Sequence, residues 1–363
     1  MTNSKTSKLV LFVIAAIALA ALPLVVGHFG QGYVRVMALA LLYVMLALGL
    51  NIVVGYAGLL DLGYVAFYAI GAYMYAWLSS PHLTKNFAWI AAMFPNGLHL
   101  PILLVIPMAA LLAGMLGMLL GAPTLKLRGD YLAIVTLGFG EIIRIFMNNM
   151  EQPINLTNGP RGIDQIDPLH LGGFNFGQTQ HLGSLTITSV EMYYYLFLVL
   201  AVFCVIISSR LERSRIGRAW MAIREDEIAA KAMGLNTRNL KLAAFGMGAT
   251  FGGVSGAMFA SFQGFISPES FSLMESIMIV AMVVLGGIGH IPGVVIGAIL
   301  LAALPELLRY MLGDLQSMTG GRIDTAIVRQ LLIALAMITV MLVRPRGLWP
   351  SKEHGKAAPV KTA

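Results

Sequence analysis

The chain has 363 residues, of which 58% are hydrophobic and only 11% are charged, and its mean hydropathy is +0.80. Soluble domains carry about 45–50% apolar and about 25% charged residues, so this composition excludes an ordinary soluble protein and a disordered chain. A lone cysteine, Cys204, excludes a disulfide scaffold within the chain. The remaining class is a polytopic membrane protein.

Apolar runs of about 20 residues, the length that crosses a hydrocarbon core, recur along the sequence. They predict an all-α fold of about ten transmembrane helices. In chain order the predicted spans are 9–27, 34–54, 60–79, 101–121, 130–149, 190–209, 241–262, 272–290, 291–312 and 325–343.

Two places in this series predict broken or re-entrant segments. The span 60–79 contains Asp61 and several tyrosines, and only the Gly- and Pro-bearing stretch 286–293 separates the spans 272–290 and 291–312. Irregular backbone at membrane depth is tolerated where protein or a water-filled cavity covers it.

Basic residues orient the predicted bundle. With a cytoplasmic N-terminus, 17 of the 24 Lys and Arg residues fall in inside segments, so the positive-inside rule predicts that both termini are cytoplasmic. A cleaved signal peptide is the alternative for residues 1–27, because residues 18–20 resemble a cleavage site. The net charge of +7 therefore lies mainly at the inner face, where it favours contact with membrane lipid and not with nucleic acid.

Two long loops differ in character. The predicted periplasmic loop 150–189 is rich in Gly, Asn, Pro and His, so we expect turns rather than regular helices. Connectors of about 40 residues are unusually long, which makes this loop a candidate docking surface as well as a possible plain connector.

The predicted inside loop 210–241 is amphipathic. It predicts one or two short helices that end at Gly234, with a charged cluster at 224–227. Its apolar residues would form one stripe, made of Ala219, Ala222, Ile223, Ile228, Ala232 and Met233. Two interpretations stay open: a helix that rests on the lipid interface, anchored by Trp220, or a helix offered to a cytoplasmic partner.

Small residues recur at a spacing of four in two later spans. They are Gly248, Gly252 and Gly256, and then Gly289, Gly293 and Gly297. Such spacing favours close helix packing in lipid, and glycines that line a substrate path are the alternative.

Two other function classes are compatible with short features of the sequence. Residues 253–256 match the G-x-S-G arrangement of rhomboid-type intramembrane proteases, which would make Ser255 a nucleophile and His290 its base. A secondary transporter normally needs an ion-coupling residue deep in the bilayer, and Asp61 and Glu275 lie close to predicted span ends. The sequence contains neither a phosphate-binding loop nor a Cys/His metal-binding spacing, so we expect no ATP hydrolysis by this chain.

Motifs spread over residues 34–349 are informative together. They are LNIVVGYAGLLDLG (50–63), TLKLRGDYLAIVTLGFGEIIR (124–144), GPxGI (159–163), SRIGRAW (214–220), REDEIAA (224–230) and ESIM with GGIG (275–289). These segments resemble the permease subunits of bacterial ABC importers for branched-chain amino acids, and the M-type subunit rather than the shorter H-type.

The resemblance implies one transmembrane permease domain over residues 1–349 and a flexible cytoplasmic tail over 350–363, in the bacterial inner membrane. It implies a second homologous permease subunit, two cytoplasmic ABC ATPase subunits that bind ATP and Mg²⁺, and a periplasmic substrate-binding protein. The chain itself would have no catalytic residue, metal or cofactor and would act by alternating access. Related permeases carry urea, amides or other amino acids, which are alternative substrates.

The resemblance also implies that 215–236 is the coupling helix that inserts into the ATPase. Ala229, Ala230 and Gly234 fit the E-A-A-x-x-x-G pattern of ABC importers, but Ile228 stands at the acidic position and Glu227 precedes it. The predicted coupling residues are Arg218, Arg224, Glu225, Asp226, Glu227, Ala229, Ala230 and Gly234.

Two further sets of residues are predicted. Polar residues within spans suggest a substrate path lined by Asn51, Tyr64, Tyr68 and Ser276. The turn of the outer loop suggests a docking site for the binding protein, made of Asn158, Gly159, Pro160, Arg161 and Gly162.

Overall fold

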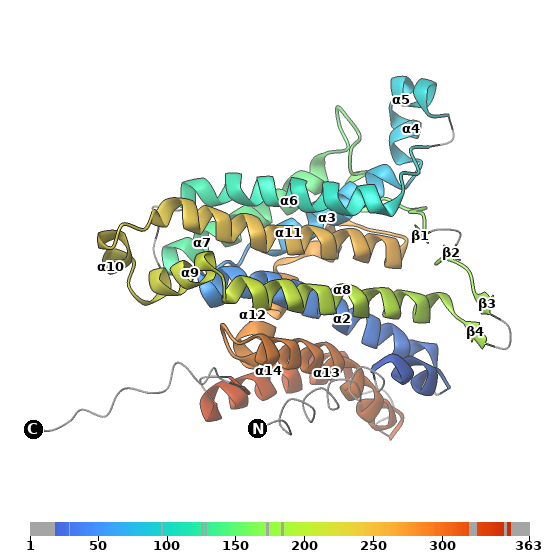
Figure 1. Cartoon of the computed structure of the whole chain (residues 1–363). Helices are drawn as coiled ribbons and strands as arrows, with labels where there is room; N and C mark the ends of the chain where they lie inside the picture. Colours follow the sequence, from blue (N-terminus) through green and yellow to red (C-terminus); the bar gives the residue numbers. More distant parts are fainter. Residues whose placement is uncertain are drawn as a thin grey trace, which may run out of the picture.

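Long helices lie side by side in the computed structural model, with short elements gathered at the two ends (Figure 1). The structure describes residues 19–28, 30–95, 97–124, 127, 129–171, 174–182, 185–318, 325–344 and 347–349. The longer helices are α2 (Gln31–Asn51), α3 (Val65–Leu78), α6 (Ile102–Thr124), α7 (Asp130–Asn149), α8 (Ser189–Glu212), α11 (Thr237–Gln263), α12 (Leu273–Gly286), α13 (Ile291–Met318) and α14 (Thr325–Val343).

Short elements mark each end of the bundle. The α9/α10 end carries α9 (Arg215–Glu225) and α10 (Glu227–Ala232), and the opposite, hairpin end carries α4 (His82–Asn86) and α5 (Ala88–Met93) (Figure 1). Two antiparallel hairpins give the hairpin end its name: β1 (His170–Leu171) pairs with β2 (Phe174–Asn175), and β3 (Gln180–Leu182) pairs with β4 (Leu185–Ile187). The mainly helical fold agrees with the predicted all-α class, and the outer loop adds these short strands to the predicted turns.

Six helices of the described part are long and apolar enough to cross a membrane. They are Gln31–Tyr56, Ile102–Thr124, Ser189–Glu212, Thr237–Gln263, Pro268–Gly286 and Ile291–Arg309. The chain is a multi-pass helical membrane protein. The number of ten spans stays a prediction, and residues 9–18 of the first span and the tail 350–363 lie outside the described residues.

Both predicted breaks are present. A π-helical turn, Ile52–Tyr56, follows α2, and residues 57–64 are not helical, so the predicted span 60–79 is shortened to α3. Residues 287–290 separate α12 from α13. The first interruption is called the α2–α3 break and the second the α12–α13 break.

Side chains and a distant segment satisfy the backbone at these breaks. The Leu62 N–H donates to Thr136 Oγ1 at 3.0 Å, and Ser276 Oγ donates to the Leu62 carbonyl at 2.6 Å. At the other break, the N–H groups of Leu348 and Trp349 donate to the carbonyls of Leu285 and Gly286, at 2.8 and 3.2 Å. Since lipid offers no hydrogen bonds, these contacts make the interruptions tolerable at membrane depth.

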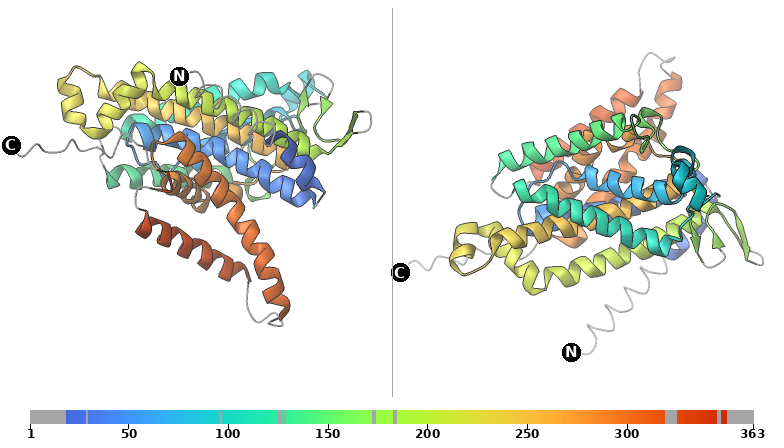
Figure 2. Two further views of the ribbon diagram at one scale, coloured as in Figure 1. Left: turned by 60° about the horizontal axis from the view of Figure 1, so that its bottom comes forward. Right: turned by 90° about the horizontal axis from the view of Figure 1, so that it is seen from above.

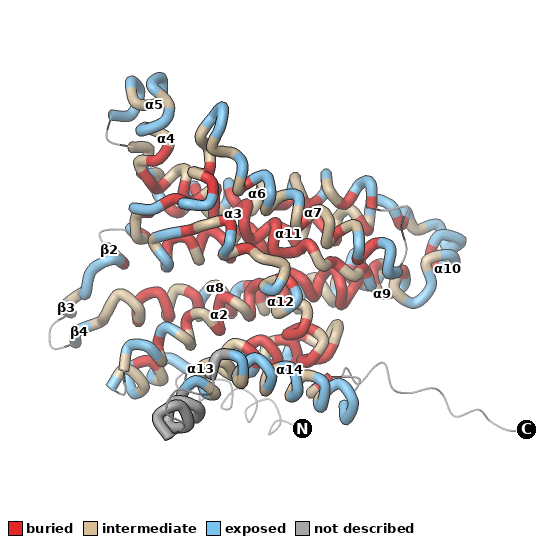
Figure 3. The backbone as a smooth tube through the Cα atoms, turned by 180° about the vertical axis from the view of Figure 1, so that it is seen from behind, coloured by how far each residue is buried: buried red, intermediate tan, exposed pale blue. Residues whose placement is uncertain are grey.

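Helix α11 forms the centre of the core. Buried residues concentrate along α2, α3 and α11, whereas α13 and α14 stand at one side of the bundle (Figures 2 and 3). A Cβ atom built on Gly248 would lie 3.0 Å from the Gly49 carbonyl, one on Gly252 would lie 3.1 Å from Phe67 Cβ, and one on Gly256 would lie 2.7 Å from the Ala72 nitrogen. The glycine series therefore serves close helix packing, as its spacing predicts.

Replacing Gly256 by alanine tests this packing. The added methyl group would meet the backbone of α3, which cannot give way as a flexible side chain can, so we expect Gly256→Ala to lower the free energy of unfolding by about 1–3 kcal/mol. The midpoint of thermal unfolding in detergent measures the loss. Gly138→Ala on α7 is the matched control, because a Cβ there would have nothing within 4 Å. Equal midpoints for the two variants would contradict the packing role.

Candidate functional site

Helix α9 is docked firmly on the bundle. Ser214 caps its first turn by accepting a hydrogen bond from the Gly217 N–H at 3.0 Å. Trp220 is 0% exposed, and its indole N–H donates to the Leu240 carbonyl at 2.7 Å. The interpretation of Trp220 as a lipid-interface anchor is therefore wrong, since its ring packs inside the protein against the start of α11.

Helix α10 begins with a sharp change of chain direction. Asp226 has φ −153° and ψ 108°, and its carboxylate accepts hydrogen bonds from the N–H groups of Ile228 and Ala229 at 2.8 and 3.0 Å. The helix is followed by Gly234 at φ +86°, where glycine is favoured. The predicted pair of short helices that ends at Gly234 is confirmed.

The change of direction at Asp226 divides the apolar stripe that the sequence predicts. Ile223 is buried, whereas Ile228 is 68% and Met233 84% exposed. The prediction of one continuous apolar face is therefore wrong, because α9 buries Ile223 but leaves Ala222 exposed, and α10 presents its part of the stripe outward.

The acidic residues of the cluster differ in their surroundings. Glu227 forms an ion pair with Lys241 of α11, at 2.7 Å, and the Lys241 side chain is only 5% exposed. Glu225 and Asp226 are exposed, as are Ala229 and the Arg218 side chain, whereas Ala230 is buried. Glu227 thus ties α10 to α11, and the exposed residues form the outward surface.

Arg224 turns inward from the end of α9. Its Nη1 group donates to the carbonyl of Gly55 in the π-helical turn after α2. The side chain is half-buried, and burial lowers the pKa of the Arg224 guanidinium from its usual value. An arginine remains protonated under these conditions, so the contact is a charge-assisted hydrogen bond.

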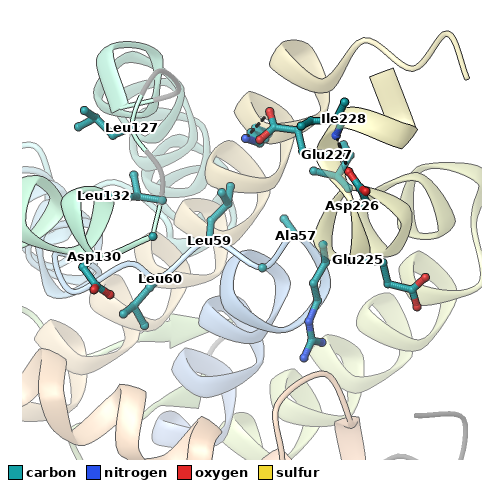
Figure 4. Close-up of a pocket in the computed structure, with 15 residues that line it drawn as sticks. Ala57, Leu59, Leu60, Leu127, Asp130, Leu132, Glu225, Asp226, Glu227 and Ile228 are labelled. Atoms are coloured by element: carbon teal, nitrogen blue, oxygen red, sulfur yellow. Dashed lines mark hydrogen bonds and ion pairs between the residues drawn. The ribbon is translucent and has the colours of Figure 1, made fainter. Parts of the chain in front are cut away.

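A cavity of about 470 Å³ lies beside these two helices (Figure 4). Residues 223–228 form one side, and the other is formed by residues 57–60 after α2 together with Leu127, Gly129, Asp130 and Leu132. Leu59, Leu60 and Leu132 face it from the second side, so carboxylates and apolar side chains share one space (Figure 4). In the part of the chain that is described, no group of three or more His, Cys, Asp or Glu residues is placed to hold a metal ion.

All four predicted path residues are buried and have partners inside the chain. Asn51 Oδ1 accepts from the Gly289 N–H at 2.9 Å, Tyr64 donates to the Gly248 carbonyl at 3.0 Å, and Ser276 holds Leu62 as described above. The Tyr68 ring packs against Phe259 and Phe271, with centroids 5.3 and 5.2 Å apart. These contacts hold the breaks and the core together, and a path along the four residues stays a prediction.

The predicted docking turn of the outer loop is pinned to the bundle. Asn158 Nδ2 donates to the Gly162 carbonyl at 2.8 Å, and Ile163 pairs with Ile266 after α11 through hydrogen bonds of 2.8 and 3.0 Å. Gly159 and Gly162 are buried, which leaves Pro160 and Arg161 exposed. Only these two of the five predicted docking residues present a side chain outward, with Asn158 half-buried behind them.

The geometry offers no support for a serine protease. The Ser255 hydroxyl is buried and donates to the Phe251 carbonyl of its own helix at 2.8 Å. His290 lies in the α12–α13 break with its ring centroid 6.3 Å from that of Trp349. Among the described contacts, none joins the serine to this histidine.

Several polar partnerships were missed because they join distant parts of the sequence. Glu275, which has no partner near it in the sequence, accepts a hydrogen bond from Tyr43 of α2. Arg144 forms an ion pair with Glu141 one helical turn earlier, at 2.6 Å, and also reaches the distant Glu269 at 3.0 Å. For the Tyr43–Glu275 hydrogen bond, the only signal in the sequence is a tyrosine within an otherwise apolar run. That signal does not identify the partner of the tyrosine.

Comparison with known proteins identifies the family. A family model described as branched-chain amino acid transport system / permease component matches residues 32–342. The chain belongs to this family. The match covers every long helix described above from α2 to most of α14, together with the α9–α10 unit.

Curated relatives agree with this family of permeases. The chain is 41% identical to the high-affinity branched-chain amino acid transport system permease protein LivM of Escherichia coli, over 96% of this chain and 76% of that protein. It is 27% identical to LivH of Salmonella typhimurium, over 84% and 90%, and 24% identical to a probable LivM of Methanocaldococcus jannaschii, over 86% and 91%. No solved structure matches the chain.

The Glu227–Lys241 pair gives a stability prediction. Glu227→Gln leaves a buried ammonium without its carboxylate, so we expect the free energy of unfolding to fall by about 1–3 kcal/mol, less than for a fully buried pair. Glu225→Gln is the control on an exposed neighbour and should leave the thermal midpoint unchanged. Lys241→Met added to Glu227→Gln should recover part of the loss. If Glu225→Gln lowers the thermal midpoint as much as Glu227→Gln does, the ion pair with Lys241 does not stabilise the position of α10.

Proposed function

We propose that this permease subunit imports branched-chain amino acids across the bacterial inner membrane. In this proposal it pairs with a second, related permease. A periplasmic binding protein delivers substrate to the pair, and two cytoplasmic ATPases drive its conformational changes. The α9/α10 end is cytoplasmic and the hairpin end is periplasmic, with both termini inside and ten spans within one domain over residues 1–349. ATP and Mg²⁺ bind to the partner ATPases and not to this chain.

The observation that carries the proposal is the construction of the α9–α10 unit. Its base is fixed by the buried Trp220 and by the pair between Glu227 and Lys241. Its tip exposes Ile228 and Met233, two large apolar side chains that nothing in the described chain covers. A rigid base with an exposed apolar tip is what a helix needs to transmit force from a partner that binds it.

Transport in this proposal needs no covalent chemistry in the chain. The ATPases bias two arrangements of the membrane helices, and α9–α10 carries that bias because it binds the ATPase differently in the two states. The exposed residues Glu225, Asp226 and Ala229 contact the partner at the outer surface of the unit. Gly234 sets the direction in which the chain leaves the tip.

Ile228→Glu tests docking of the ATPase. The side chain is exposed, so the substitution should spare folding but place a charge in the proposed apolar contact, where burying an unpaired carboxylate costs several kcal/mol. We expect the ATPase to be lost from the purified complex and ATP-dependent leucine uptake to fall about tenfold or more. Ile154→Glu is the matched control, because Ile154 is 54% exposed at the opposite end. Undiminished ATPase recovery with Ile228→Glu would exclude α10 as the docking helix.

Arg161→Gln tests docking of the binding protein on the outer loop. Arg161 is exposed on a turn that Asn158 holds rigid, so its charge is available to a partner and its loss should not disturb the fold. Rim charges mainly change association rates, so we expect the concentration of binding protein for half-maximal uptake to rise about two- to tenfold. Gln178→Glu, which changes the net charge of the same loop by the same amount, should have a smaller effect. Equal effects would indicate general electrostatics instead of a docking site at Arg161.

A further inference from the structure

Arg224 meets two segments that are far apart in the sequence, residues 55–58 after α2 and Gly289 before α13. Its guanidinium donates to the Gly55 carbonyl, and a Cβ atom built on Gly289 would lie 2.9 Å from Arg224 Nη1 and 3.2 Å from the same carbonyl. A Cβ atom on Gly58 would lie 2.7 Å from Arg224 Cγ. The side chain thus runs along the chain that follows α2 and ends beside the α12–α13 break.

The far side of this contact is closed by Asn51. Its Oδ1 atom accepts the hydrogen bond of the Gly289 N–H at 2.9 Å, and the residue is 0% exposed. A Cβ atom on Gly55 would lie 2.7 Å from Asn51 Cγ and 2.9 Å from the Gly289 nitrogen. Asn51, Gly55, Arg224 and Gly289 therefore form one packed cluster, called the break junction below.

The break junction joins the end of α9 to both interruptions of the membrane helices. Gly55 lies in the π-helical turn that leads into the α2–α3 break, and Gly289, at φ +83°, lies within the α12–α13 break. Broken segments are where helices change direction at low cost, because no continuous ladder of hydrogen bonds has to be disrupted. A displacement of α9 therefore reaches both breaks through a single side chain.

We propose that Arg224 is a positioning residue that couples movement of α9 to the two breaks, instead of a residue that contacts the ATPase. Its guanidinium donates to the Gly55 carbonyl inside the bundle, whereas the surface proposed to face the ATPase is formed by Glu225, Asp226 and the exposed residues of α10. This inference rests on the proposed function, since it assumes that an ATPase moves α9–α10. Arginine suits the role because its planar group stays charged and holds a fixed geometry at a carbonyl.

The test uses the full complex in lipid vesicles, with Arg224→Gln, Arg224→Lys and the control Arg215→Gln, which changes an exposed arginine of the same helix. Three quantities are measured: recovery of the ATPase with the permease, ATP hydrolysis, and leucine transported per ATP. We expect Arg224→Gln to keep the first two and to lower leucine per ATP about tenfold, the factor for loss of one charge-assisted hydrogen bond. Arg224→Lys should recover part of the coupling, and Arg215→Gln should match the unmodified protein.

Asn51→Ala approaches the same junction from its other side and leaves Arg224 in place, so it remains informative if Arg224→Gln does not reach the membrane. It should also give ATP hydrolysis with little transport. The double variant should be no worse than the worse single variant, because both changes open one junction. Losses that multiply in the double variant would overturn the proposal.

Two other results would also overturn it. Normal leucine per ATP in Arg224→Gln would mean that the contact with Gly55 carries no motion, and loss of the ATPase from that variant would make Arg224 a docking residue. Failure of the proposed function is distinguishable from both. In that case vesicles with the unmodified complex would lack ATP-dependent leucine uptake.

Discussion

Every backbone N–H and C=O group inside a bilayer needs a partner from the protein, and this chain interrupts its membrane helices twice. Both interruptions are held by a few polar side chains placed in otherwise apolar runs. Thr136 and Ser276 serve the α2–α3 break, and Asn51 serves the α12–α13 break. Polar residues within spans are often suspected of binding substrate, but here these three first provide the hydrogen bonds that a straight helix would have made for itself.

The same constraint bears on the role proposed for the α9/α10 end. A straight helix resists local movement because each turn is bonded to the next, whereas a break is held by single contacts that can be exchanged. Both breaks converge near the end of α9, which is itself locked to α11 through Trp220. The fold therefore connects both interruptions of its membrane helices with the short helices α9 and α10 at one end of the bundle.

The sequence predicts most of the architecture that depends on local patterns. Apolar runs identify the long helices, polar residues in the span 60–79 indicate the first break, the Gly- and Pro-bearing stretch 286–293 indicates the second, and Gly234 identifies the end of α10. It predicts less well what depends on distant contacts: Tyr43 meets Glu275 across 232 positions, and nothing in either local sequence specifies that meeting. Trp220 was open to two interpretations for the same reason, because a tryptophan in an amphipathic helix suits a lipid interface and a protein core equally well.

In the candidate site, too, local patterns are predicted from the sequence and distant contacts are not. Family motifs point to the α9–α10 segment, but only the coordinates distinguish Glu227, which turns inward to Lys241, from its exposed neighbours Glu225 and Asp226. An acidic run on a short amphipathic segment looks uniform in sequence. The acidic residues differ in role only because α11 places Lys241 beside Glu227 and not beside its neighbours.

The short segment 347–349 has a consequence for how the protein is made. Its N–H groups cover the carbonyls of Leu285 and Gly286, which emerge from the ribosome well before it does. The α12–α13 break therefore reaches its final hydrogen bonding only after synthesis has passed α14 and reached Trp349. A nascent permease that stops short of this segment therefore lacks the partners for the Leu285 and Gly286 carbonyls and has an open α12–α13 break.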